Sequence, residues 1–308
     1  LLLCSTLAAA AGGAENPPER LTVALDGAVN PTHAPLVVAQ QKGFFTDHDL
    51  EVTLETPDTA EEAVRRVASG KADVAVTRQP RLHVLVGQGQ PIKRIGTLIA
   101  LPLSAVVVLQ DSPVNAIADL KGRRIGYRTD DDRALLNAVL ARHAVAPDQV
   151  TLAPVGDDWL AELTAGRVDA VTGISRTQDL PAMVLAGRSA RAFFVEEQGI
   201  PPYDELILVA NREKLTDARL RRFLRAVEQG VRYIVNHPEA AWQAFAAHDP
   251  ALDTELSRRV WSATLTRFAL RPAALDNGRY KRFATFLTGQ GLINVALPVS
   301  NYALELTD

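Results

Sequence analysis

A short phrase occurs twice in this sequence and constrains the fold more than any other feature. The segment GKADVA at residues 70–75 recurs as GRVDAV at residues 166–171, each time after a short amphipathic stretch. Glycine favours the left-handed position that ends a helix, and the apolar run after the aspartate predicts a strand buried on both faces. The two copies therefore predict two α/β lobes built alike. We expect Asp73 and Asp169 to anchor the strand starts, away from any ligand.

Strand and helix patterns alternate in both halves of the chain. Apolar runs at 21–26, 50–55 and 73–76 predict strands, and amphipathic segments between them predict helices. The order restarts at 124–127, and the run at 205–211 predicts a strand that returns to the first lobe. This pattern predicts an α/β fold with two lobes, each an open mixed sheet flanked by helices. The expected boundaries are 20–103 plus 213–308 for lobe 1, 114–203 for lobe 2, and 104–113 and 204–212 for a hinge of two crossing strands.

Composition narrows the class of partner. The 308 residues are enough for two domains with a core each, and 47% of them are apolar. The net charge is −3, from 33 basic and 36 acidic side chains. Because no basic stripe is interleaved with aromatic residues, we expect no nucleic-acid partner.

The first residues resemble part of a secretory signal. Residues 1–14 combine an apolar stretch with small residues suited to cleavage, which predicts a signal-peptide remnant and an exported, periplasmic protein. Cys4 is the only cysteine and lies in this leader, so we expect no disulfide and no cysteine metal site after it. Acylation of Cys4 is the alternative, and the bulky Leu3 before it argues against a lipoprotein anchor.

No catalytic constellation stands out. The six histidines include no pair at zinc-binding spacing, and the sequence has neither a nucleophile elbow nor a phosphate-binding loop. The acidic run at 130–132 fits a solvated loop or the first turn of a helix better than a metal site. We therefore expect a protein that is not an enzyme and that holds no cofactor or metal.

Polar residues gather instead at the carboxyl ends of the predicted strands and at the two crossings. Ligands of open α/β sheets bind at these strand ends, so these residues predict a binding site. A buried carboxylate such as Glu205 needs a cationic or N–H partner, which a ligand amine could supply. The candidate ligand-binding residues are Asp26, Asn30, His33, Thr77, Arg78, Gln79, Ser104, Thr129, Asp130, Ser175, Arg176, Tyr203 and Glu205.

Segments spread along the chain resemble, in order, the substrate-binding proteins of ABC importers. Residues 33–39 and 42–45 are similar to the HAPLYVA…KGYF opening of the group that captures thiamine pyrimidine precursors, whose wider relatives bind alkanesulfonates, taurine and nitrate. Further similar segments lie at 70–80, 119–127, 166–171 and 203–212. The resemblance implies a two-lobed type 2 periplasmic-binding-protein fold, a monomer that closes on a small molecule and delivers it to an ABC permease. By position, it places Asn30, His33, Gln79 and Glu205 among the pocket residues.

The sequence departs from that group where aromatic side chains would stack on the ligand. Gly27 and Ala28 stand in place of a tryptophan, Arg78 replaces the tyrosine of a YQP motif, and Ser175 replaces a third aromatic. These changes remove stacking surface and add a guanidinium group with five donors. The alternative ligand is therefore an anion such as a sulfonate or a carboxylate.

Two further alternatives follow from the resemblance. Eukaryotic relatives are enzymes that build the thiamine pyrimidine from a histidine and pyridoxal phosphate with an iron-linked, cysteine-rich motif. The lack of cysteine after Cys4 and the export signal count against that activity. A sensor without a cognate permease is the other alternative, and the sequence does not separate it from a transporter component.

Overall fold

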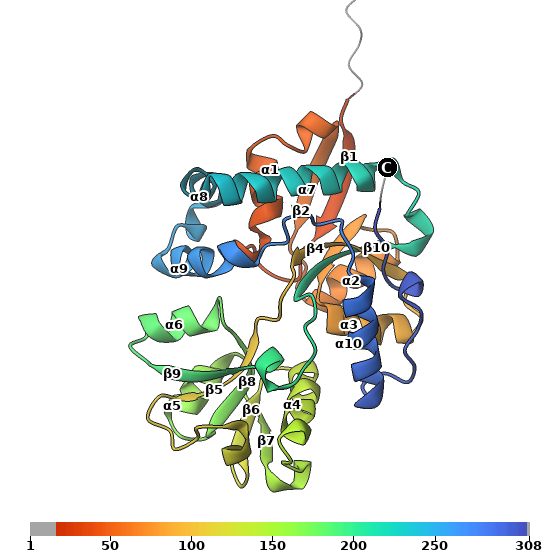
Figure 1. Ribbon diagram of the computed structural model, residues 1–308. Helices are drawn as coiled ribbons and strands as arrows, with labels where there is room; N and C mark the ends of the chain where they lie inside the picture. The colour runs from red at the N-terminus through yellow and green to blue at the C-terminus, as the bar shows by residue number, and fades with distance from the viewer. Residues whose placement is uncertain (1–16, 307–308) are drawn as a thin grey trace, which may run out of the picture.

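The computed structural model describes residues 17–306, which form two five-stranded sheets with helices on their faces (Figure 1). The expected leader at 1–14, with Cys4, lies outside the described residues. Among the helices of the described part, none has both the length and the apolar character needed to cross a bilayer.

The first sheet has the strand order β2-β1-β3-β10-β4. β1 is parallel to β2 and β3, and β10 is antiparallel to both of its neighbours, β3 and β4. Its core strand β3 is fully buried, as the apolar run after Asp73 predicts. The strands are β1 (Glu19–Ala24), β2 (Leu50–Glu55), β3 (Val74–Thr77), β4 (Ile92–Ile99) and β10 (Leu206–Asn211).

The second sheet repeats this arrangement in the order β7-β6-β8-β5-β9. β6 is parallel to β7 and β8, and β5 is antiparallel to β8 and β9. β5 and β10 therefore occupy equivalent positions. Each is antiparallel to both of its neighbours, and each is the first strand that the chain forms after it crosses into that sheet. The strands are β5 (Ser104–Leu109), β6 (Arg124–Tyr127), β7 (Thr151–Pro154), β8 (Ala170–Ser175) and β9 (Ala190–Phe194).

The segments that connect the sheets are 100–103 and 195–205, because β5 and β10 belong entirely to the sheets. They lie a few residues N-terminal to the hinge ranges expected from the sequence. An apolar run shows where a strand lies, but not which sheet it joins. Two mixed sheets flanked by helices and joined by two crossings make up the expected α/β architecture.

Helices cover both faces of each sheet. α1, α7, α8 and α9 pack on one face of the first sheet, and α2, α3 and α10 on the other. α4 packs on one face of the second sheet, and α5 and α6 on the other. The helices are α1 (Ala34–Gln41), α2 (Ala60–Ala68), α3 (Gln79–Gly87), α4 (Asp130–Arg142), α5 (Trp159–Thr164), α6 (Asp179–Leu185), α7 (Ala218–Asn236), α8 (Pro238–Ala246), α9 (Glu255–Thr264) and α10 (Asn277–Gly289).

Helix α10 packs against both lobes. Its residues Tyr280 and Ala284 join the core beside the first sheet, whereas Phe283 and Leu287 join the core of the second. Figure 1 shows this helix reaching from the first sheet towards α4. The expected assignment of 213–308 to lobe 1 does not foresee these contacts with lobe 2.

The repeated phrase has the same structural role in both lobes. Gly70 and Gly166 have φ values of +75° and +68°, in the left-handed region that glycine adopts without strain. An Asp73 carboxylate oxygen accepts a hydrogen bond from the Thr22 N–H at 2.9 Å, and Asp169 accepts one from the Arg124 N–H at the same distance. Each aspartate therefore ties the start of its strand to the neighbouring strand, as expected.

Candidate functional site

Two cavities of about 470 and 860 Å³ lie between the lobes. We call them the apolar cavity, which reaches Val84, Leu135 and Leu292, and the polar cavity, which reaches Asn30, Ser175 and Asp179. They share a set of lining residues and so form one interlobe cleft. The shared residues are Asp26, Arg78, Ser104, Thr129, Asp132 and Glu205.

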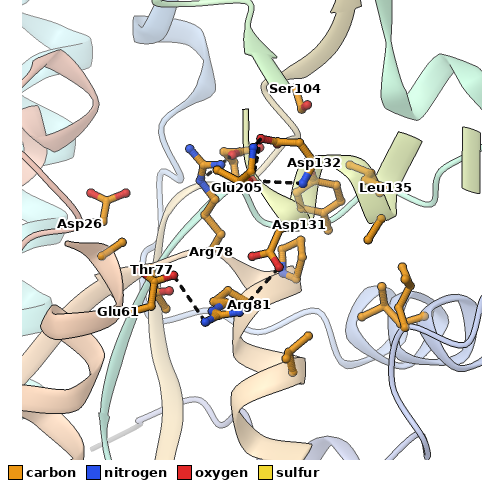
Figure 2. A pocket seen from close by; sticks show the side chains of 18 residues that line it. Asp26, Glu61, Thr77, Arg78, Arg81, Ser104, Asp131, Asp132, Leu135 and Glu205 are labelled. Atoms are coloured by element: carbon orange, nitrogen blue, oxygen red, sulfur yellow. Dashed lines mark hydrogen bonds and ion pairs between the residues drawn. The ribbon is translucent and has the colours of Figure 1, made fainter. Parts of the chain in front are cut away.

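An arginine–glutamate pair lies at the centre of the cleft (Figure 2). The Arg78 Nε lies 3.3 Å from a Glu205 carboxylate oxygen, and the Glu205 side chain is only 7% exposed. The other Glu205 oxygen accepts a hydrogen bond from the Leu103 N–H at 2.8 Å. The carboxylate raises the pKa of Arg78, so this guanidinium stays charged. Because Leu103 and Glu205 belong to different connecting segments, the two crossings meet at this carboxylate.

A buried network holds the segment next to Glu205. The Asp204 carboxylate accepts hydrogen bonds from the Thr97 and Tyr280 hydroxyls at 2.7 and 2.9 Å and from Arg279 at 2.7 Å. The Asp204 N–H donates to the Gln79 side-chain oxygen at 2.7 Å. Gln79 is fully buried and does not line the cleft, so it positions the crossing instead of facing a ligand.

Asp26 lines the cleft and is held from behind by a histidine. The His33 Nε2 lies 2.8 Å from an Asp26 carboxylate oxygen, and His33 Nδ1 accepts from the Asn30 N–H at 3.3 Å, so Nε2 carries the proton given to Asp26. Burial opposes the charge of Asp26, but His33 and Arg78 outweigh it and lower the pKa of Asp26. His33 is 1% exposed and lies outside the cleft lining, as a support for Asp26.

The first turn of α4 forms the wall on the side of lobe 2. Residues 130–132 were expected to form a solvated loop or the first turn of a helix, and they form the first turn: α4 begins at Asp130, capped by the Thr129 side chain. Asp132 closes this capping box: its Oδ2 accepts from the Thr129 N–H and hydroxyl at 3.0 and 2.7 Å. Asp130 is 81% exposed and pairs with Arg133, outside the cleft lining. Asp131 and Asp132 line the cleft in its place.

Residues after β8 complete the polar cavity. The Asp179 carboxylate accepts from the Ser175 N–H at 2.6 Å and pairs with Arg128 at 3.2 Å, while burial raises the pKa of Asp179. Arg176 points away from the cleft: it pairs with Glu196 and lies over the Phe194 ring, 3.6 Å from its centroid. β8 ends at Ser175 and the chain turns at Arg176, so these two adjacent side chains point in different directions.

Two contacts join the lobes across the cleft. The Gln178 side-chain amide donates to the Asn30 side-chain oxygen at 3.1 Å, and Arg81 lies 3.7 Å from Asp131. The residues predicted from the sequence do not include Gln178, Arg81 or Asp131, because the contacts of these residues depend on how the lobes meet. Their only local signal was their place just after a strand or a cap.

The remaining predicted residues lie on the cleft wall. Thr77 ends β3 and Tyr203 precedes Glu205, and both line the apolar cavity. Burial raises the pKa of Tyr203 well above its usual value, so its hydroxyl stays protonated. The Ser104 hydroxyl oxygen is buried and has no hydrogen-bond partner in the described part of the chain.

The cleft carries more negative than positive charge. Three guanidinium groups face it, from Arg78, Arg81 and Arg128. More carboxylates than this line it: Asp26, Glu61, Asp131, Asp132, Asp157, Asp179 and Glu205. Within residues 17–306, no group of three or more His, Cys, Asp or Glu side chains is arranged to hold a metal ion.

Comparison with known proteins identifies the family. The model of the family described as NMT1/THI5 like matches residues 30–241. A Haemophilus influenzae protein named for thiamine biosynthesis is 41% identical over 290 residues, which cover 94% of this chain and 92% of the relative. This chain belongs to the NMT1/THI5-like family.

Other relatives of this chain have different names. A formylaminopyrimidine-binding protein of Halalkalibacterium halodurans is 26% identical over 251 residues, covering 80% of this chain and 76% of that protein. A 4-amino-5-hydroxymethyl-2-methylpyrimidine phosphate synthase of Uromyces fabae is 27% identical over 256 residues, covering 78% and 74%. The relatives of this chain therefore include proteins named as binders and proteins named as enzymes.

Solved structures confirm the expected fold. The periplasmic aliphatic sulphonate binding protein SsuA of Escherichia coli matches with a TM-score of 0.74 at 15% identity, over 94% of each chain. The NMT1/THI5-like chain described here thus has a periplasmic-binding-protein fold. At this identity the match shows the fold alone.

Proposed function

We propose that this protein is an exported, periplasmic solute-binding protein that captures an aminopyrimidine related to the thiamine precursors. It delivers that ligand, as a monomer, to an ABC permease. The observation that carries the proposal is the Arg78–Glu205 pair with Asp26 at the centre of a cleft between two lobes. The names of two relatives, one for thiamine biosynthesis and one for formylaminopyrimidine binding, support the same ligand class.

The donors and acceptors of the cleft match an aminopyrimidine. Such a ring offers N–H donors on its exocyclic amine and acceptors at its ring nitrogens. Glu205 and Asp26 are acceptors for the amine, and Arg78 and the Ser104 hydroxyl are donors for ring nitrogens.

The charge of the cleft argues against the anionic alternative. An anion would have to approach a surface on which carboxylates outnumber guanidinium groups. Arg78, the cation gained relative to the pyrimidine binders, is already paired with Glu205. A sulfonate bound to the free nitrogens of Arg78 would lie next to the Glu205 carboxylate, and these like charges would repel each other.

The cleft also has the means to close on its ligand. The contacts from Gln178 to Asn30 and from Arg81 to Asp131 form only when the lobes approach. A ligand that touches both lobes favours this arrangement, because only a difference in affinity between the open and closed forms can shift the equilibrium.

Titration calorimetry with the purified protein tests the proposal. We expect 4-amino-5-hydroxymethyl-2-methylpyrimidine or formylaminopyrimidine to bind with one site per chain, and MOPS or an alkanesulfonate not to bind. Glu205→Gln should weaken pyrimidine binding at least tenfold, as expected when a charged hydrogen-bond partner is lost. The matched control is Asp130→Asn, which removes one exposed carboxylate outside the cleft. Sulfonate binding without pyrimidine binding would refute the proposal.

The second candidate function is pyrimidine synthesis, which the relatives named as synthases favour. The sequence argues against it, since no cysteine follows Cys4 to provide a cysteine-rich motif. Incubation with pyridoxal phosphate and ferrous iron, followed by mass spectrometry, separates the two. Formation of a pyrimidine phosphate would establish the enzyme.

A further inference from the structure

One carboxylate of the cleft forms no ion pair within residues 17–306. Asp132 is 8% exposed and lines both cavities. Its hydrogen bonds come from Thr129 and go to Oδ2, whereas Oδ1 accepts neither of them. The three cleft arginines pair with other carboxylates: Arg78 with Glu205, Arg81 with Glu61 and Asp131, and Arg128 with Asp157 and Asp179. The Asp132 charge helps to raise the pKa of the nearby Arg78, but the ion pair of that arginine is with Glu205. A cation on the ligand would therefore supply the direct partner that Asp132 lacks.

The strand next to this carboxylate requires a glycine in a left-handed backbone conformation. Gly173 in β8 has φ +80°, and a Cβ there would lie 2.4 Å from the Asp132 Cγ. Only glycine therefore leaves room for the Asp132 carboxylate against the strand. With the capping box of Thr129 on its other side, the carboxylate is fixed at the junction of the two cavities.

The apolar cavity extends from this junction away from the Arg78–Glu205 pair. Val84 on α3, Leu135 on α4 and Leu292 after α10 line it, and all three are partly exposed. Figure 2 shows Leu135 on the far side of Asp132 from Asp26. These three apolar side chains come from three separate segments and face the same space. A single ring whose polar groups bind Arg78 and Glu205 would leave that space empty.

From these contacts we infer that the ligand is an organic cation of two parts, a deepening that rests on the proposed function. A nitrogen-rich ring binds at Arg78, Glu205 and Asp26. A positively charged substituent binds to Asp132 Oδ1, and its apolar end lies against Val84, Leu135 and Leu292. This ligand is larger and more positive than the neutral hydroxymethylpyrimidine.

Calorimetry with a small ligand series tests the inference. The probes are neutral 4-amino-5-hydroxymethyl-2-methylpyrimidine, its aminomethyl counterpart, which is a cation at neutral pH, the N-propyl derivative of that cation, and benzylammonium, which lacks the pyrimidine. We expect the aminomethyl compound to bind at least tenfold tighter than the hydroxymethyl compound, and the N-propyl compound tighter still.

Two variants assign the effect to the residues. Asp132→Asn keeps the cap acceptor for Thr129 and should reduce binding of the cations about tenfold or more, with less than a threefold change for the neutral ring. Asp130→Asn, the matched control two residues away, should change neither. Leu135→Trp fills the apolar cavity and should remove the gain from the propyl group while the neutral ring binds as before.

The outcomes separate the inference from the proposed function. If the neutral ring binds and the cations bind no tighter, or if Asp132→Asn weakens all ligands equally, the inference is wrong and the proposed function stands. If only benzylammonium binds, in an Asp132-dependent way, the cation site stands and the pyrimidine function is wrong. If no probe binds, both are wrong.

Discussion

Replacing Gly173 by alanine should destabilise the protein more than the same change at Gly187, another glycine of lobe 2. Any L-residue at φ +80° is strained by about 1–2 kcal/mol. The new Cβ would also lie 2.4 Å from the Asp132 Cγ, whereas ordinary contacts begin at 3.4 Å, so the carboxylate must move by about 1 Å. That movement breaks the capping box with Thr129, which is worth about 1 kcal/mol. We expect Gly173→Ala to lower the free energy of unfolding by about 2–3 kcal/mol.

Gly187→Ala provides the matched control. Gly187 has φ +67° in the same lobe, but a Cβ there meets nothing within 4 Å, so this variant bears only the backbone strain. Urea unfolding followed by fluorescence measures both, and calorimetry with the aminomethyl pyrimidine measures ligand affinity. Gly173→Ala should lose about 1 kcal/mol more stability than Gly187→Ala and should bind the cation at least tenfold more weakly. Equal stability losses with unchanged affinity would show that Asp132 is not held as described.

Three further predictions concern pH, the cross-lobe contact and the hinge. Burial lowers the pKa of His83 from 6.5 to about 4, so the neutral side chain contributes fully to stability above pH 6.5, and this contribution is lost as pH falls towards 4. In urea titrations, the difference in the free energy of unfolding between wild type and His83→Phe should therefore fall by roughly 3 kcal/mol over that range. A difference that does not change with pH would contradict this prediction. Gln178→Ala removes the bond to Asn30 and should weaken ligand binding several-fold in calorimetry while the melting temperature of the free protein stays within 2 °C; a large loss of melting temperature would instead show a structural role. Gln79→Leu leaves the buried Asp204 N–H without an acceptor and should lower the free energy of unfolding by roughly 1–3 kcal/mol; an unchanged value would contradict the positioning role.

The sequence predicts those parts of the site that follow from local pattern. A polar residue just after a buried strand lies at the sheet edge where ligands bind, so Arg78, Thr77 and Ser175 were predicted from position alone. Glu205 was predicted from its place at a crossing. Position in the sequence does not predict which side chains face the cleft in the first turn of a helix, because this depends on where the helix begins. Asp130 was predicted to face the ligand and Asp132 was not, but in the first turn of α4 Asp130 points to solvent and Asp132 faces the cleft.

Other features depend on contacts between distant segments. The bond between Gln178 and Asn30 joins residues 148 positions apart, and no local pattern encodes it. Gln79 was placed in the pocket by resemblance, but its amide lies beneath the crossing, where it accepts from the Asp204 N–H. Residues that support a site and residues that face it can therefore stand side by side in the sequence. Packing alone separates them.

The position of Asp132 bears on how binding is coupled to closure. Arg78 and Asp26 belong to the first lobe, and Glu205 lies on a connecting segment, so a ligand bound to these three alone can be held while the lobes stay apart. Such a ligand gains nothing from closure and does not shift the equilibrium between open and closed forms. A group that reaches Asp132 contacts the second lobe as well, and that contact exists only when the cleft is closed. The ring contacts the second lobe through Ser104 at the start of β5, and the charge on the ligand would add the contact with Asp132 that strengthens the coupling of binding to closure.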